Sequence, residues 1–405
     1  MKDNKINKLL KYVDELHEKS EEEIETEKKR KFTHILSLIE KFLIEKKIVL
    51  YGGTAMNMYL PKKHKFYKDY ELPDYDGFCV NPEKVALELV NILKKHSYEY
   101  ITIRHALHDG TFKITWEFND IADFSKISYS DYKLILKNSS TINNLKVANI
   151  NLIKCNAYYE LCLPKSAMFR WSKVFKRIMI LEKNVAIKTV QYKSDYWITN
   201  KVPIIKIVLD NIVSYVIKND YVFSGMKALL YYMNENIFDH KHLHENTRYI
   251  QFWTDNVDQS ISDIKIILME HNVKYKIYNS KSNSFIPDKK NIDVIINDKK
   301  IRLISIVNTD ANCFSYKTIK VNKKNIRICT IPFMLYLFYY YLYVHNNTSS
   351  LLSIKCTSLI SKLVKKINNE DFVTECFGFH KSTSAIKKSR AKKKIGLVYK
   401  DSILK

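Results

Sequence analysis

Apolar residues before position 47 recur at the spacing of one helix face. The residues on that face are Ile35, Leu38, Ile39, Phe42 and Leu43. This period of three to four residues predicts a helix over 21–47, and a similar pattern predicts an earlier one over 6–17. The charged run that begins the second of these helices, Glu21 to Lys31, is typical of a solvated helix surface.

A different pattern begins at residue 48, where a short apolar run predicts a buried strand over 48–51. The Gly52-Gly53 step then leads into a short helix near 55–60, and a polar stretch continues to Leu72. The elements expected after it are a strand around Asp74 and Asp76, a helix over 82–95, strands over 98–105 and 111–124, and a helix that carries 169–177. Mixed helices and strands of this kind predict an α/β (α+β) fold.

The second half of the chain repeats this order of patterns. Val222–Leu229 aligns with Val49–Met56, and Asn256–Tyr275 aligns with Asn81–Tyr100. Two weaker matches pair Lys300–Val307 with Thr111–Phe118, and Ile331-Pro332 with Leu163-Pro164. The other interpretation is that two α/β segments resemble each other by chance patterning.

In this alignment Asp74 and Asp76 fall opposite Tyr249 and Gln251, so the second copy lacks both carboxylates. We therefore expect a degenerate second domain that supports the first. The predicted organisation is N-terminal helices over 1–47, a catalytic domain over 48–198, the degenerate domain over 199–345 and a basic C-terminal extension over 346–405. The extension contains the run Lys387 to Lys394, for which RNA binding and a solvated tail are equally open.

Composition narrows the class of partner. The 405 residues carry 67 Lys and Arg against 43 Asp and Glu, a net charge of +24, which favours a polyanion such as nucleic acid. A Lys-biased coding composition is the alternative source of part of this excess. The seven cysteines are scattered without a Cys-x-x-Cys pair, which argues against zinc and against a disulfide framework and suggests a reducing compartment. The most apolar window, 331–344, is too short to span a bilayer, so no membrane association is expected.

The candidate chemistry lies around Asp74 and Asp76. Two carboxylates one residue apart on a strand point to the same face, where they can hold divalent cations. The preceding Gly52-Gly53 step allows the backbone to approach a bulky anion such as a triphosphate. Nucleotidyl transfer requires an anion-binding site next to a site that binds metal ions. The alternative for the two aspartates is a polar turn after Pro73.

A third carboxylate is expected at Asp123. Its apolar neighbours Ile121, Ala122 and Phe124 place it on a strand, where a buried carboxylate without a partner would be costly. Asp120 is the alternative residue for the same role.

These segments resemble the poly(A) polymerase catalytic subunit of nucleocytoplasmic large DNA viruses, in particular the giant-virus and African swine fever virus type. The stretches that carry the resemblance are Leu50-Tyr51-Gly52-Gly53-Thr54-Ala55-Met56-Asn57, Leu72-Pro73-Asp74-Tyr75-Asp76-Gly77-Phe78, Gly110-Thr111-Phe112-Lys113 and Ile121-Ala122-Asp123-Phe124. The resemblance covers about residues 45–180. It implies a polymerase-β-like nucleotidyltransferase fold and template-independent transfer of AMP from ATP to the 3′ end of mRNA.

The resemblance also implies roles for individual residues. Asp74, Asp76 and Asp123 would bind two Mg²⁺ or Mn²⁺ ions and make up the catalytic set. Gly52, Gly53 and Thr54 would hold the ATP triphosphate. One departure is the spacing of twenty residues between Gly53 and Asp74, a stretch that contains Lys62, Lys63, Lys65 and Lys68 and that we expect to form a basic loop near RNA or triphosphate.

A basic set, Arg170, Lys173 and Arg177, falls at helical spacing. It would contact ATP phosphates or the RNA backbone, and an ordinary solvated face is the equal alternative. The partners expected are RNA and ATP, together with a homodimer mate or a viral processing partner, in the host cytoplasm (the viral factory) and the virion. The alternatives to polyadenylation are nucleotidyl transfer to another acceptor (a tRNA end, a small molecule or a protein) and an inactive RNA-binding scaffold.

Overall fold

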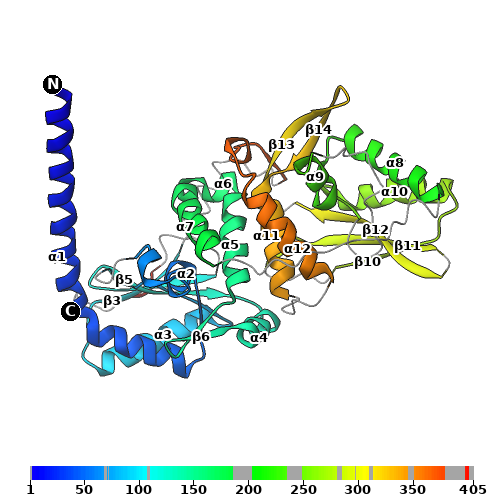
Figure 1. The fold of residues 1–405 in the computed structure, drawn as a ribbon. Coiled ribbons are helices and arrows are strands. Elements are labelled where there is room, and N and C mark those ends of the chain that lie inside the picture. The colour runs from blue at the N-terminus through cyan, green and yellow to red at the C-terminus, as the bar shows by residue number, and fades with distance from the viewer. Residues whose placement is uncertain are drawn as a thin grey trace. The chain divides into compact units, whose positions relative to one another are not determined.

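A computed structural model describes residues 2–67, 71, 73–106, 110–185, 203–234, 249–280, 285–296, 298–309, 313–344, 351–378 and 397–400. The chain forms two compact units (Figure 1). Unit 1 consists of Met1–Ile150 together with Ile386–Lys405, and unit 2 consists of Asn151–Ala385. These units are defined by compactness, whereas the domain limits 48–198 and 199–345 remain predictions from the sequence.

Unit 1 is built on one mixed sheet. Its helices are α1 (Lys2–Glu45), α2 (Gly52–Met58), the 3₁₀ turn η1 (Lys62–His64), α3 (Pro82–Lys95) and α4 (Tyr129–Asn138). Its strands are β1 (Val49–Tyr51), β2 (Tyr75–Cys79), β3 (Ile101–His105), β4 (Thr111–Trp116), β5 (Asn119–Lys126), β6 (Ser140–Ile142), β7 (Leu145–Val147) and β16 (Leu397–Lys400). The strand order is β16-β3-β4-β5-β2-β1-β7-β6.

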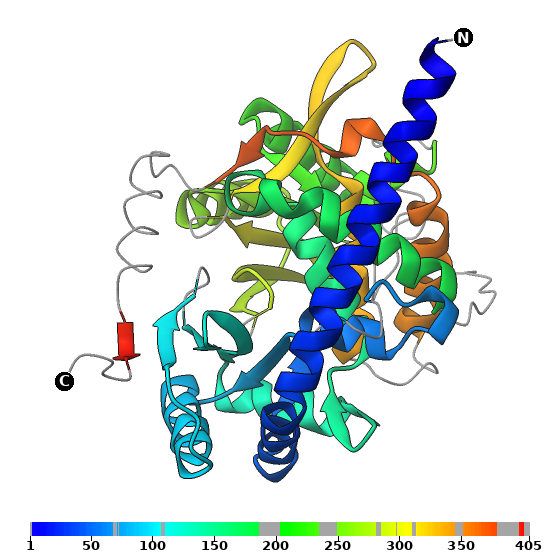
Figure 2. The ribbon, with the colours of Figure 1, turned by 90° about the vertical axis from the view of Figure 1, so that its left-hand side faces the viewer.

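The second half of α1 anchors this helix to the core of unit 1. The buried residues on its inner face are Phe32, Ile35, Ile39, Phe42 and Leu43. They repeat at the predicted helical spacing, and α1 packs against α3 and β7. The sequence predicted two helices here, but α1 is a single continuous helix (Figure 2). Residues 18–20 contain no Gly or Pro, so nothing in the backbone chemistry ends the helix there.

Unit 2 contains a second mixed sheet and more helices. Its helices are α5 (Ile150–Leu161), α6 (Pro164–Ala167), η2 (Met168–Arg170), α7 (Trp171–Asn184), α8 (Pro203–Lys218), α9 (Gly225–Tyr232), α10 (Val257–Glu270), α11 (Ile331–Val344), α12 (Leu351–Val364) and η3 (Asn369–Asp371). Its strands are β8 (Val222–Ser224), β9 (Ile250–Thr254), β10 (Tyr275–Asn279), β11 (Lys289–Ile296), β12 (Lys299–Asn308), β13 (Phe314–Val321), β14 (Lys324–Cys329) and β15 (Cys376–Phe377).

The two sheets share one topology. Unit 1 has the order β3-β4-β5-β2-β1-β7-β6, and unit 2 has the corresponding order β10-β11-β12-β9-β8-β14-β13. The helices agree as well, because α3 and α10 both follow an asparagine at the N-cap, Asn81 and Asn256, and both end before a histidine. The internal repeat read from the sequence is therefore present in the fold.

Two matches of the predicted repeat were wrong. Lys300–Val307 lies in β12, which corresponds to β5 and not to the strand that begins at Thr111. Similarly, α11 follows β14 as α5 follows β7, so Ile331-Pro332 corresponds to the start of α5 and not to Leu163-Pro164. Apolar patterning alone does not distinguish neighbouring strands of a sheet from one another.

The single strand predicted over 111–124 is a hairpin. Its turn is Glu117 and Phe118, whose φ angles of 45° and 67° reverse the chain between β4 and β5. Two consecutive residues with positive φ are typical of a two-residue hairpin turn, which usually contains Gly or Asn. Because this turn contains neither, no local signal marks it.

The Tyr-rich helix α11 is part of the core of unit 2. Tyr336, Tyr339 and Tyr343 are each at most 1% exposed. These rings are covered within unit 2, so they do not form an exposed surface. In the part of the chain that the structure describes, each helix is either too short or too polar to span a bilayer.

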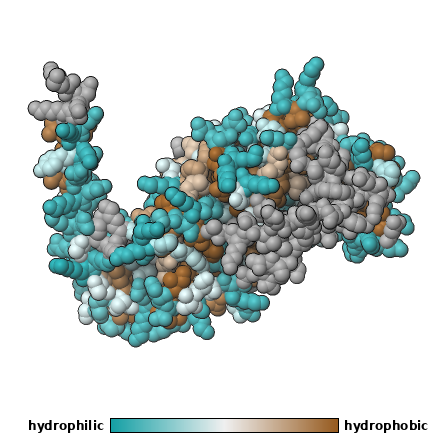
Figure 3. All heavy atoms as spheres, viewed as in Figure 1, coloured by the Kyte–Doolittle hydropathy of each residue, from teal (hydrophilic) through white to brown (hydrophobic). Residues whose placement is uncertain are grey.

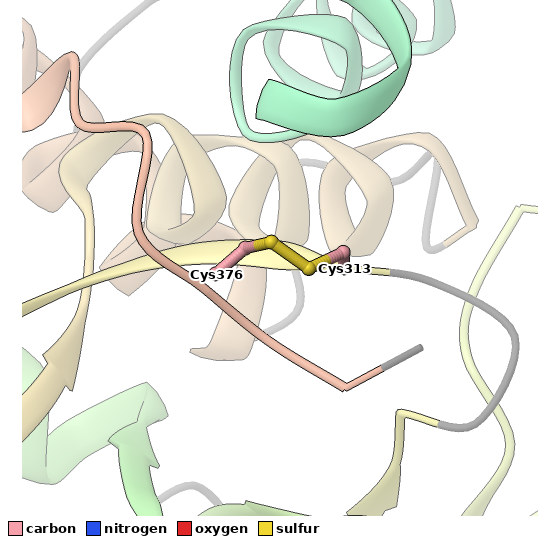
Figure 4. Close-up of a disulfide and its surroundings, with 2 residues drawn as sticks. All are labelled: Cys313 and Cys376. Atoms are coloured by element: carbon pink, nitrogen blue, oxygen red, sulfur yellow. A yellow bond between two sulfur atoms is a disulfide. The ribbon is translucent and has the colours of Figure 1, made fainter. Parts of the chain in front are cut away.

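Unit 2 also contains a disulfide, between Cys313 and Cys376 (Figure 4). It joins the start of β13 to β15, which pairs with β13 through Phe314 and Phe377. The sequence argued against a disulfide framework and did not indicate this pair, because strand pairing brings together residues that are 63 positions apart. The predicted basic run Lys387 to Lys394 lies outside the described residues, and β16 beyond it pairs with β3.

Candidate active site

Four side chains of unit 1 form a row across adjacent strands. Asp76 of β2 is paired with Tyr51 of β1 on one side and with Asp123 of the parallel strand β5 on the other. Asp123 is in turn paired with Lys113 of β4. Residues paired across neighbouring strands point to the same face of a sheet, so the two carboxylates and the ammonium group share one face.

The diglycine step fits closely against this row. Gly52 has φ +70°, and a Cβ added to it would lie 2.0 Å from Oδ2 of Asp76. Only glycine meets both conditions, because other residues are strained at this φ and have no room for a side chain. The backbone at Gly52 and Gly53 therefore passes directly beside Asp76 at the start of α2.

Asp74 lies just before β2, so it precedes the strand that the sequence predicted for it. Its backbone N–H donates to Oγ1 of Thr54 over 3.1 Å. The Thr54 hydroxyl thus fixes the approach to β2 and links the turn after β1 to Asp74. Of the residues predicted for this site, the structure brings Gly52, Thr54, Asp74, Asp76 and Asp123 together.

Lys113 balances the charge of the buried carboxylates. Its Nζ lies 3.3 Å from Oδ2 of Asp123 and 2.6 Å from Oδ2 of Asp120. Burial raises the pKa of Asp123 to about 6, even though the charge of Lys113 lowers it, and the charge of Asp74 raises it further. Desolvation is thus the dominant effect on Asp123.

Asp120 was the alternative to Asp123, and the structure separates the two. Asp120 follows a shift in register between β4 and β5, so it is paired with Thr115 and not aligned with Asp76. Its side chain is 41% exposed, against 13% for Asp123. Asp123 is therefore the residue that shares the row with Asp76.

The donor atoms of this site suit a hard divalent cation. Oδ1 of Asp74 and Oδ1 of Asp123 are buried and have no hydrogen-bond partner. Carboxylate oxygens are the ligands that Mg²⁺ and Mn²⁺ prefer, and two unpaired buried ones are costly unless a cation neutralises them. Within the described part of the chain, no ready-made group of three His, Cys, Asp or Glu residues is arranged around a metal position. The observation that favours a cation is therefore the pair of unpartnered oxygen atoms.

A hydroxyl chain beside the row was not found from the sequence. The Tyr51 hydroxyl and the Ser125 hydroxyl lie 2.6 Å apart, and Oγ1 of Thr111 lies 2.7 Å from the same Ser125 oxygen. Ser125 is two residues after Asp123, so the period of a strand puts both side chains on one face. That spacing was the signal available in the sequence.

The basic set of Arg170, Lys173 and Arg177 belongs to unit 2. Nε of Arg170 lies 3.3 Å from Oε2 of Glu160, and the charges of Arg170 and Arg177 lower the pKa of Glu160 against the larger raising effect of burial. These residues and the carboxylate row lie in different units. Their predicted role in ATP or RNA binding stays a prediction.

Unit 2 has an uncharged version of the same row. The residues at the corresponding registers are Ser224, Gln251, Ser305 and Asn291. Gly225, with φ +60°, occupies the position of Gly52, and a Cβ there would lie 3.2 Å from Oε1 of Gln251. The predicted alignment of Gln251 with Asp76 therefore holds in three dimensions, and the row of unit 2 has no carboxylate for a cation.

Comparisons with known proteins agree with the resemblance seen in the sequence. Residues 37–167 match the family model for the poly(A) polymerase catalytic subunit. A protein of African swine fever virus (isolate Tick/South Africa/Pretoriuskop Pr4/1996) is 29% identical over 168 residues, which cover 40% of this chain and 35% of that protein. A protein of Acanthamoeba polyphaga mimivirus is 25% identical over 166 residues, which cover 40% of this chain and 28% of that protein. Both carry the name of a poly(A) polymerase catalytic subunit.

These matches cover only part of each relative, since the chain spans about a third of the length of the curated relatives it matches. The fold agrees over a much longer stretch. The crystal structure of the Megavirus polyadenylate synthase superposes with a TM-score of 0.73 and 18% identity, covering 95% of this chain and 81% of that one. The predicted α/β fold class is therefore confirmed across both units.

Proposed function

We propose that this chain adds AMP from ATP to the 3′-hydroxyl of RNA without a template, as a polynucleotide adenylyltransferase (a poly(A) polymerase). The observation that carries the proposal is the row of Asp76 and Asp123 beside the Gly52 turn, with unpartnered oxygens on Asp74 and Asp123. This row lies inside the segment that matches the catalytic-subunit family. The degenerate row of unit 2 gives the contrast, because it keeps the glycine and has no carboxylate.

The reaction forms one bond and breaks another. The 3′-oxygen of RNA attacks the α-phosphorus of ATP, the bond from that phosphorus to the bridging β-oxygen breaks, and pyrophosphate leaves as the hydroxyl loses its proton. Bound at Asp74, Asp76 and Asp123, Mg²⁺ or Mn²⁺ would supply the positive charge that such a phosphoryl transfer requires.

The protein's own residues would position and neutralise the reactants. The backbone at Gly52 and Gly53 would pass close to the triphosphate, since no side chain intervenes there. Lys113 would balance the carboxylate charge before nucleotide binds. The Thr54 hydroxyl would keep Asp74 in place by accepting a hydrogen bond from the Asp74 backbone N–H. Positioning and charge stabilisation of this kind account for most of the catalysis in phosphoryl transfer.

The partners of the proposed reaction follow from charge. The net charge of +24 favours RNA as the acceptor over a small neutral molecule. The basic set Arg170, Lys173 and Arg177 and the extension 346–405 are proposed to contact the RNA backbone. A viral processing partner and a site of action in the host cytoplasm or the virion remain predictions from the family resemblance.

A primer-extension assay tests the proposal. The full chain is incubated with a short labelled RNA, Mg²⁺ or Mn²⁺, and each nucleoside triphosphate separately. We expect a ladder with ATP, and we expect Asp76→Asn and Asp123→Asn to lose about a hundred-fold or more of the rate. The exposed Asp258→Asn of unit 2 is the matched control and should keep full activity. Extension by none of the nucleotides, or full activity of Asp76→Asn, would replace the proposal with an RNA-binding scaffold.

A binding measurement separates the cation from the chemistry. Titration of Mn²⁺ into the unsubstituted chain, followed by calorimetry without nucleotide or RNA, should give a heat of binding that Asp123→Asn weakens. Identical binding curves for the two proteins would remove Asp123 from the proposed cation site.

A further inference from the structure

The first half of α1 carries an apolar face that nothing in the described part of unit 1 covers. The side chains on it are 50–58% exposed, and they are Ile6, Leu9, Leu10, Tyr12, Val13 and Leu16. Burial of α1 begins only later, with Phe32 at 2% exposure. Apolar residues lie among hydrophilic ones along this part of the helix (Figure 3). A cluster of this kind marks an interaction site in a soluble protein.

These six residues form one stripe. At 100° per residue they fall within an arc of about 160° on the helix, and Lys8, Lys11, Glu15 and Glu18 occupy the opposite side. Ile6 and Val13 repeat at seven residues, as do Leu9 and Leu16, which is the pattern of a helix-packing seam. Ser20 and Glu23 take the next two positions at this spacing, and the next exposed apolar residue on this side of the helix is Ile24, which is 52% exposed.

The stripe is symmetric about its own centre. Counted outward from Lys11, Leu10 is matched by Tyr12, Leu9 by Val13, and Ile6 by Leu16. When two identical helices meet across a twofold axis in opposite directions, residue i contacts residue j and residue j contacts residue i. An antiparallel second copy centred on Lys11 would therefore give every apolar residue of the stripe an apolar neighbour.

Charge selects the same orientation. Residues 2–8 contain three Lys and one Asp, a net charge of +2, and residues 14–20, which face them in this pairing, contain three Asp or Glu and one Lys, a net charge of −2. Parallel pairing would place the acidic segments side by side. Antiparallel pairing places the basic segment of one helix toward the acidic segment of the other, which lowers the electrostatic free energy.

We infer that the N-terminal stripe of α1 is a self-association surface, on which a second copy of this chain packs antiparallel across a twofold axis at Lys11. The contact involves only six apolar residues from each copy, so it is small for a protein interface. The dimer is therefore concentration-dependent. This inference is independent of the proposed catalytic function, because the residues of the stripe lie outside the carboxylate row.

Sedimentation velocity over a hundred-fold range of concentration tests the surface. We expect a monomer–dimer equilibrium for the full chain, and at least a ten-fold weaker dimer for Leu9→Glu. Asn7→Glu adds the same charge on the opposite side of the helix and should leave the dimer nearly unchanged. Thermal unfolding of both variants should match the parent, because neither side chain is in the core. A monomer at every concentration, or equal dimerisation of the two variants, would overturn the inference.

Cysteine cross-linking tests the orientation. Leu9→Cys and Val13→Cys are prepared separately and then mixed under mild oxidation. In the antiparallel dimer Leu9 meets Val13 of the other copy, so the mixture should cross-link much faster than either variant alone. The described free cysteines, Cys79, Cys155, Cys162 and Cys329, are buried, and the unsubstituted chain provides the background. Efficient cross-linking of each variant with itself would indicate parallel helices and contradict the inference.

Discussion

Gly52 and Gly225 offer a matched pair of positions at the scale of single residues. Both have positive φ, and each lies beside the second residue of its row. Gly52→Ala would place a methyl group 2.0 Å from Oδ2 of Asp76, whereas Gly225→Ala would place one 3.2 Å from Oε1 of Gln251. We expect Gly52→Ala to abolish adenylate transfer in the primer-extension assay, because it displaces Asp76.

Gly225→Ala is the control for backbone strain. It should lower the unfolding free energy by about 1–2 kcal/mol, because alanine is strained in the left-handed conformation. Adenylate transfer should continue. Urea unfolding followed by circular dichroism measures this cost. Equal loss of activity in the two variants would mean that strain, and not the approach to Asp76, explains the effect at Gly52.

The buried carboxyl of Asp123 predicts a pH dependence of stability. Its pKa is raised from 3.8 to about 6, so the folded chain holds this proton more tightly than the unfolded chain does. The unfolding free energy therefore falls as pH rises from about 4 to 6, and the cost of the buried charge persists above pH 6. Asp123→Asn removes that cost.

Thermal unfolding across pH measures this effect. In buffer without divalent cations, Asp123→Asn should melt a few degrees above the parent at pH 8, and the difference should shrink toward zero at pH 4. Asp258→Asn, at an exposed position, should show no such trend. A melting difference for Asp123→Asn that stays constant with pH would contradict the expected ionisation.

At the scale of elements, a buried ion pair links three helices of unit 2. Nζ of Lys154 in α5 lies 2.8 Å from Oε2 of Glu182 in α7, and Tyr339 of α11 donates its hydroxyl to Oε1 of the same carboxylate. The Lys154 side chain is 1% exposed, and burial lowers its pKa, partly offset by Glu182. A charge this deeply buried is tolerated only with its partner.

A double-mutant cycle measures this link. Glu182→Leu leaves the ammonium group buried without its counter-charge, so it should cost about 3–5 kcal/mol of unfolding free energy. Lys154→Met combined with Glu182→Leu should cost much less, because no buried charge remains. Denaturant unfolding of the two singles and the double gives the coupling energy. Additive losses would show that the pair acts as two independent side chains.

At the scale of the whole molecule, the charge of +24 predicts salt-dependent RNA binding. Each phosphate contact on single-stranded RNA contributes about −0.7 to the slope of log affinity against log salt. With about five contacts, a four-fold rise in salt should weaken binding by about 100-fold. Fluorescence anisotropy with a labelled oligo(A) measures the slope, and an affinity that does not change with salt would exclude backbone recognition.

The same measurement tests the basic set. Lys173→Ala should make the slope shallower by about 0.7 if this residue contacts a phosphate, whereas Lys218→Ala in α8 is the control with the same change of charge. Equal slopes for the two variants would assign Lys173 to an ordinary solvated face.

Sequence alone determined what depends on local chemistry. The helix at Pro82–Lys95, the strand at Val49–Tyr51 and the alignment of Gln251 with Asp76 follow from apolar period and residue order, and the structure has all three. The turn at Glu117 and Phe118 and the uninterrupted α1 could not be read this way. The turn has no Gly or Asn to mark it, and in α1 the change from an exposed apolar stripe to a charged run looks like a break although no Gly or Pro ends the helix.

Tertiary structure decided what depends on residues far apart in the chain. Strand pairing put Asp123, and not Asp120, in line with Asp76, and placed Lys113 between two carboxylates. It also joined Cys313 to Cys376 and buried the tyrosines of α11. Local propensity fixes the direction of a side chain along its own strand, but register between strands decides which side chain it meets, and register is settled only when the whole sheet forms.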